Sequence, residues 1–290
     1  MYDSVLIATD GSDVAEQAAT LGISLAEALE GTVHALSVVA NGENDASTAP
    51  ARSETAAESV ADRATEAGCD ARAVVREGRP ANEILATADE IDADLLVVGT
   101  HGRTGLRQTF FGSVALEVIR DARQPVISVG PDTYTAAETG SEVDEAGGIQ
   151  GTAPFEEVLL ATDGWPGSRD AGEHALELAN ALDATLHIIY AVDVRSDSMD
   201  IRDGFKQHGD RSTEALADRA RAAGIDVTRT LVDGAPDDVI LSYAADNAVD
   251  LVVMGTESKS RLERFVVGSV SQQVVSNAPV PVMTVRTLED

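Results

Sequence analysis

The stretch DLLVVGTHGRTGLRQTFFGS, residues 94–113, decides the fold that we expect for this chain. It opens with a short run of branched apolar residues, which is typical of a buried parallel strand. A glycine-rich loop follows, and after it Val114, Val118 and Ala122 recur at helical spacing. The glycines therefore stand where a strand leaves a sheet and the next helix begins. Unpaired N–H groups and the positive end of the helix dipole attract phosphate at such a point.

The loop contains no acidic residue, and its charged side chains are Arg103 and Arg107. Its glycines lack a Cβ, so the backbone can approach a bound anion closely. A glycine-rich turn alone is a weak signal, because most such turns only change the direction of the chain. The two arginines fit a solvated loop as well as they fit a phosphate. The stretch by itself leaves both interpretations open.

The composition describes a strongly acidic chain. Asp and Glu total 50 against 21 Lys and Arg, which gives a net charge of −29 over 290 residues. The acids are scattered through helical patterns, so they indicate a solvated surface rather than a disordered tail. Self-repulsion of this size opposes folding unless salt screens it, and we therefore expect a halophilic cytoplasm as the setting. Nucleic acid and anionic membranes are poor partners for such a surface.

Cysteine use and hydropathy are also consistent with a cytoplasmic protein. Cys69 is the single cysteine, which excludes an intrachain disulfide and a thiolate metal cluster. The start of the sequence has no signal-peptide pattern, and no apolar run reaches transmembrane length. We therefore expect a cytoplasmic location and no membrane partner.

Apolar strand patterns alternate with amphipathic helix patterns along the first half of the chain. The strand patterns cover residues 5–8, 33–39, 71–75, 94–98 and 125–129. Residues 41–52, after the second of them, are polar and are expected to form a loop. Strands that alternate with helices predict a parallel α/β sheet with helices on both faces.

The same pattern then starts again. Residues 158–164 repeat residues 5–11 with an offset of 153 (158 − 5), and residues 250–255 repeat residues 94–99 with an offset of 156 (250 − 94). Such an internal duplication predicts two tandem units, each an open parallel sheet of five strands. The expected division is a first domain, a flexible Gly- and Ser-containing linker and a second domain, at residues 1–130, 131–153 and 154–290.

These motifs resemble those of the universal stress protein family, in a tandem form. The features that carry the resemblance are ATDGS at residues 8–12, GRP at 78–80, DLLVVGTHG at 94–102 and GSV at 112–114. The family's nucleotide motif G-x2-G-x9-G-[ST] matches the chain from Gly99 onward. The resemblance covers both repeats apart from the linker and the polar loops. It implies a Rossmann-like fold of the adenine nucleotide alpha hydrolase type.

The resemblance also implies ATP, with or without Mg²⁺, bound at the carboxyl ends of the strands, where open α/β sheets place their ligands. Asp10 would lie near the adenine and ribose, although an Asp here could instead cap the first helix. Val38 would contact the adenine through its backbone. The ribose and phosphates would be held by Gly99, Gly102, Gly112, Ser113 and Val114.

The second repeat departs from this motif. Its matching positions are Asp163, Gly255, Ser258, Gly268 and Ser269. Ser258 stands where the motif has its second glycine, and Glu257 precedes it. A Cβ near the phosphates and an added carboxylate both weaken the binding of an anion. We therefore expect the second site to bind ATP more weakly than the first.

The expected function is that of a cytoplasmic stress-response protein that binds ATP, mainly through its first repeat. No nucleophile–base pair or metal-ligand cluster is evident, so no catalytic or metal residue is predicted and slow ATP hydrolysis is the most that the sequence supports. Two alternatives stay open: a weak Mg²⁺-dependent ATPase or phosphotransferase, and an adaptor that binds no nucleotide. The edge strands at 126–129 and 282–285 are expected to pair within one chain as a pseudo-dimer, with further homo-oligomers left open.

Overall fold

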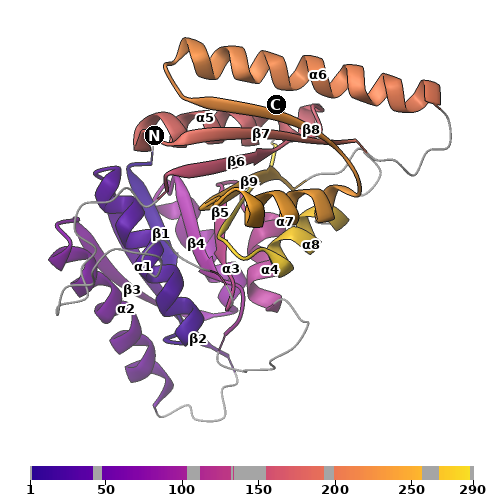
Figure 1. Cartoon of the computed structure of the whole chain (residues 1–290). Coiled ribbons are helices and arrows are strands. Elements are labelled where there is room, and N and C mark those ends of the chain that lie inside the picture. Colours follow the sequence, from indigo (N-terminus) through magenta and orange to yellow (C-terminus); the bar gives the residue numbers. More distant parts are fainter. Residues whose placement is uncertain are drawn as a thin grey trace. The chain divides into compact units, whose positions relative to one another are not determined.

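A computed structural model gives the fold of the chain (Figure 1). It describes residues 2–41, 48–102, 112–131, 133, 155–192, 199–256 and 268–287. The chain divides into two compact units, Met1–Pro154 and Phe155–Asp290. The expected linker at 131–153 lies mostly outside the described residues, so its flexibility stays a prediction.

The first unit is a five-stranded parallel sheet with the order β3-β2-β1-β4-β5. Its strands are β1 (Ser4–Ala8), β2 (Thr32–Ala40), β3 (Ala71–Gly78), β4 (Leu95–Gly99) and β5 (Val126–Val129). Its helices are α1 (Asp13–Ala28), α2 (Ala49–Glu66), α3 (Pro80–Glu90) and α4 (Ser113–Asp121). The order reverses between β1 and β4, and a crevice at such a reversal is where open α/β sheets bind ligands.

The second unit repeats this arrangement with the order β10-β9-β6-β7-β8. Its strands are β6 (Glu157–Ala161), β7 (Thr185–Val192), β8 (Val227–Asp233), β9 (Leu251–Gly255) and β10 (Val282–Val285). Its helices are the short η2 (Pro166–Ser168) and then α5 (Arg169–Leu182), α6 (Met199–Ala222), α7 (Pro236–Asp246) and α8 (Ser269–Asn277). The expected duplication and fold class are therefore confirmed.

The central strands form the core of each unit. Leu6 and Leu96 in the first unit, and Leu159 and Val252 in the second, expose none of their surface. Helices cover both faces of the first sheet, because α1 packs with α2 and α3 packs with α4. Burial on both faces explains why these strands are continuous apolar runs rather than alternating ones.

One local expectation was wrong. Residues 41–52 were expected to be a loop, but α2 begins at Ala49. Pro50 occupies one of the first two positions of this helix, where its missing N–H costs nothing. Among the described residues, no helix is both long enough and apolar enough to span a membrane.

Candidate functional site

In the first unit, the predicted site residues gather at the carboxyl edge of the sheet. Asp10 lies two residues beyond the end of β1 at Ala8, and Gly99 ends the neighbouring β4, whose Val98 is paired with Ala8. Val38 lies two residues beyond Leu36, the β2 partner of Ala8, and is half-buried. The strand order thus brings Asp10, Val38 of β2 and Gly99 at the end of β4 to one edge of the sheet.

The start of α4 lies at the same edge and carries no side-chain cap. Its first intrahelical bond runs from the N–H of Leu116 to the carbonyl of Gly112, at 3.1 Å. The N–H groups of Ser113 and Val114 therefore precede the helical ladder. Ser113 is exposed and Val114 is half-buried, so these N–H groups can donate hydrogen bonds to an anion.

Both ends of the glycine loop are held at Thr100. Its N–H donates to the carbonyl of Val129 at 2.8 Å, and its carbonyl accepts from the N–H of Gly112, also at 2.8 Å. In the second unit, Thr256 makes the equivalent bonds to Val285 and Gly268, both at 3.0 Å. Arg103, Arg107 and Ser258 lie between these ends, outside the described residues, so their roles stay predictions.

Two of the motif glycines lie close to other parts of the protein's own backbone. A Cβ on Gly99 would lie 3.2 Å from the backbone of Val14 and Ala15, at the start of α1. A Cβ on Gly112 would lie 2.7 Å from the carbonyl oxygen of Thr100. The sequence predicts that these glycines let the backbone approach an anion, whereas in the structure they lie close to another part of the chain's own backbone.

Asp10 does not cap α1. The N-cap is Ser12, whose hydroxyl accepts from the N–H of Ala15 at 3.4 Å. Asp10 Oδ1 accepts from the N–H of Ser12 at 3.0 Å, which fixes the carboxylate beside the helix start. A Cβ on Gly102 would lie 2.8 Å from Asp10 Oδ2, so the second motif glycine leaves room for this carboxylate.

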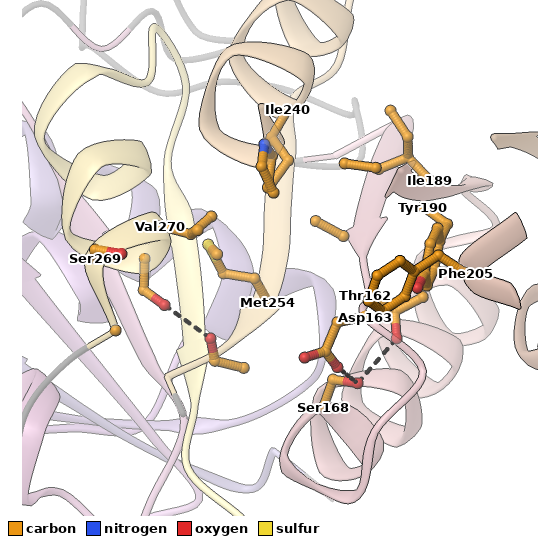
Figure 2. A pocket seen from close by; sticks show the side chains of 16 residues that line it. Thr162, Asp163, Ser168, Ile189, Tyr190, Phe205, Ile240, Met254, Ser269 and Val270 are labelled. Carbon is orange, nitrogen blue, oxygen red and sulfur yellow. Dashed lines mark hydrogen bonds between the residues drawn. The ribbon is translucent and has the colours of Figure 1, made fainter. Parts of the chain in front are cut away.

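In the second unit, the equivalent positions surround a cavity of about 280 Å³ (Figure 2). Asp163 after β6, Gly255 at the end of β9, and Gly268 and Ser269 at the start of α8 all line it. Further lining residues come from β7, α6 and α7 (Ile189, Tyr190, Ala191, Phe205, Pro236 and Ile240), and the others are Ala161, Thr162, Ser168, Met254, Val270 and Ser271. Ser258 lies outside the described residues.

The Asp163 carboxylate is held at the rim of this cavity. Its Oδ1 accepts from the N–H of Trp165 and from the hydroxyl of Ser168, each at 3.0 Å. The Ser168 hydroxyl also lies 2.9 Å from Thr162 Oγ1. Burial, with Asp163 nearby, raises the pKa of Tyr190, so its phenol stays neutral at ordinary pH. Asp163 is the one Asp, Glu, Lys, Arg or His side chain among the described lining residues.

Sequence reasoning missed the aromatic side of this cavity. Tyr190 and Phe205 line it, and His208 of α6 packs edge-on against Tyr190 with ring centroids 6.2 Å apart. Trp165 stacks on His208 at 4.6 Å. The signal that could have found them is the comparison of the two repeats position by position.

The fold and the candidate site define an α/β protein in which, at the carboxyl ends of the parallel strands, an acidic side chain and the start of a helix line one cavity in the second unit. The universal stress protein family matches residues 1–130 and 154–286. The chain therefore belongs to the universal stress protein family and carries two of its domains in tandem.

Known relatives agree with this assignment. A universal stress protein of Methanocaldococcus jannaschii is 31% identical over 140 residues, which are 46% of this chain and 82% of the relative. A Staphylococcus haemolyticus protein of the same description is 33% identical over 143 residues, 47% of this chain and 87% of that protein. The crystal structure of a universal stress protein from Archaeoglobus fulgidus covers 99% of both chains with a TM-score of 0.70. At 20% identity, that likeness concerns the fold.

Proposed function

We propose that this protein is a cytoplasmic universal stress protein that binds ATP, mainly through its first unit, as part of a stress response. One observation carries the proposal. In both units, a fixed carboxylate after the first strand and an uncapped helix start lie at the same carboxyl edge of the sheet. In the second unit, these two features flank a cavity.

The two features suit opposite ends of an adenine nucleotide. A carboxylate accepts hydrogen bonds from the amino group of a base or from ribose hydroxyls. A helix start binds phosphate through its N–H groups and its dipole. The lining between Asp163 and Ser269 is largely apolar, which suits a planar base. Mg²⁺ would arrive with the phosphates, because the described residues contain no group of three or more acidic, His or Cys side chains placed to hold a metal.

The proposal that ATP binds mainly to the first unit rests on Gly102 and on the charges of the loop that follows it. Gly102 leaves room for Asp10, whereas the second repeat has Ser258 at this position. Residues 103–111 carry two arginines and no acid. Residues 257–267 carry three cations and two glutamates, so the loops differ by one unit of charge (2 against 3 − 2). The charge difference is thus smaller than the glutamates alone suggest, and the glycine becomes the stronger argument.

The test is calorimetric titration of the full chain with Mg-ATP in molar salt, after mass analysis of any nucleotide that purifies with it. We expect close to one strong site per chain, with a second site weaker by roughly ten- to a hundredfold. Two equal sites would contradict the preference for the first unit. A folded protein that binds no nucleotide would support the adaptor alternative, and sustained turnover of ATP would support the enzyme alternative.

A further inference from the structure

The cavity of the second unit has an aromatic wall, formed by Tyr190 and Phe205 with His208 behind Tyr190. Figure 2 shows Tyr190 and Phe205 together on the side of the cavity that holds Asp163. Helix α6 is fitted to this wall, because a Cβ on Gly209 would lie 2.5 Å from the Tyr190 ring. The glycine thus lets a large ring lie between β7 and α6.

The first unit has no aromatic residue at the matching positions. Two pairs of residues fix the alignment: His187 matches His34 at an offset of 153 (187 − 34), and Gly224 matches Gly68 at 156 (224 − 68). Both of these glycines have a positive φ, +83° and +91°. With these offsets, the first-unit counterparts of Tyr190, Phe205, His208 and Gly209 are Ser37, Ala49, Arg52 and Ser53.

The different residues at these positions give the cavity wall a different chemistry in the two units. Ser37 is 1% exposed, and its hydroxyl is buried without a hydrogen-bond partner among the described residues. Tyr190 presents a buried ring at the same place, and Phe205 adds a second ring where the first unit has Ala49. One unit therefore has a small polar group at this wall, and the other has two aromatic rings.

The described lining of the second cavity is also poor in positive charge. It contains the Asp163 carboxylate and no Lys, Arg or His side chain. The start of α8 supplies the equivalent of about half a positive charge, which suits one anionic group. A triphosphate carries several negative charges and would depend on the loop at 257–267, whose three cations and two glutamates leave one net positive charge, against two for residues 103–111.

We infer that the cavity of the second unit binds a nucleoside or a nucleoside monophosphate, that is, a nitrogen heterocycle with at most one phosphate, while ATP binds to the first unit. This inference rests on the proposed function, because it assumes that the carboxyl edge of each sheet is a nucleotide site. The base packs against Tyr190 and Phe205, Asp163 accepts an N–H or O–H group of the ligand, and a single phosphate meets the N–H groups of Ser269 and Val270.

The chain contains its own reporter for this site. Trp165 is the single tryptophan of the sequence, so tryptophan fluorescence comes from the second unit alone. Its backbone N–H donates to the Asp163 carboxylate, and its ring stacks on His208 behind the aromatic wall. A ligand that binds between Asp163 and Tyr190 is therefore expected to change the emission of Trp165.

The experiment titrates the full chain in molar salt with adenosine, AMP and ATP, and follows both Trp165 emission and heat. Adenosine and AMP are expected to saturate the emission change at concentrations at least about tenfold lower than ATP. Phe205→Ala should weaken adenosine binding by at least about tenfold, and Phe205→Leu by less, because it keeps the apolar volume but loses the ring. Gln207→Ala, an exposed neighbour on the same helix, is the matched control and should change nothing.

The outcomes separate this inference from the proposed function. If ATP is the tightest ligand by Trp165 emission, or if Phe205→Ala leaves the adenosine affinity unchanged, the inference is wrong while ATP binding stands. If neither emission nor heat responds to adenosine or AMP, the inference is likewise wrong. If adenosine binds as expected but no Mg-ATP site is found by calorimetry, the ligand class of the second unit holds and the proposal for the first unit fails.

Discussion

Replacement of Gly102 by serine places the residue type of the second repeat in the first site. A Cβ at this position would lie 2.8 Å from Asp10 Oδ2, closer than a Cβ contact can be, so the carboxylate or the loop must shift. Asp10 Oδ1 is held by the N–H of Ser12, so the displacement falls on Oδ2, the oxygen beside Gly102. We expect Gly102→Ser to weaken ATP binding while leaving the fold intact.

The size of the effect follows from the loss of the hydrogen bond that Asp10 is proposed to accept from the nucleotide. A hydrogen bond to a charged group contributes about 1.5–3 kcal/mol. Since 1.4 kcal/mol corresponds to a factor of ten, the affinity for Mg-ATP should fall by roughly 10- to 150-fold. Little loss of stability is expected, because Gly102 is exposed and has no left-handed backbone angle that a serine would strain.

Calorimetry with Mg-ATP in molar salt measures this loss, and circular dichroism checks the fold. Gly204→Ala is the matched control, because no atom lies within 4 Å of a Cβ at this exposed position of α6. It should leave ATP binding unchanged and stabilise the helix by about 0.5–1 kcal/mol. A folded Gly102→Ser variant that binds Mg-ATP within about twofold of the wild type would refute the role given to Asp10.

Three further predictions follow from charge, packing and sheet edges. Because the net charge is −29, the melting temperature should fall as salt drops from molar to tens of millimolar; an unchanged value in dilute buffer would argue against the halophilic setting. Gly112→Val should abolish ATP binding in the first unit, since its Cβ would lie 2.7 Å from the carbonyl oxygen of Thr100 and shift the start of α4; undiminished calorimetric binding by the folded variant would contradict this. We still expect the edge strands β5 and β10 to pair within one chain, and an experimental structure with both edges unpaired would overturn that prediction.

The architecture was largely predictable because it depends on local patterns. Buried runs such as residues 95–98 and the recurrence at offsets of 153 and 156 are properties of the sequence alone, and they led to the strands and to the duplication. The start of α2 was missed because the polar residues that precede it resemble a loop, although Pro50 marks an early helical position.

The reasons behind the site residues were less predictable. That Gly112 faces the carbonyl of Thr100, rather than only a ligand, depends on how the loop returns, which sequence spacing does not reveal. Comparison of the repeats can single out Tyr190 and Phe205 as aromatic positions of the second unit, but that they form one wall between β7 and α6 is seen only in the structure. Periodicity identifies each of them as an apolar position and does not indicate what they surround.

The bonds that Thr100 and Thr256 make have a consequence for how this protein could be rebuilt. Each threonine closes its loop by accepting from the glycine that precedes the next helix, at 2.8 Å and 3.0 Å. The enclosed segments, residues 101–111 and 257–267, have equal length, because both ends keep the offset of 156 (257 − 101 and 267 − 111). We therefore expect that the two segments can be exchanged between the units while the strand and the helix that frame each of them are kept, because the framing bonds and the length are the same. Such an exchange would separate the part of the ligand preference that depends on the loop from the part that depends on the cavity wall.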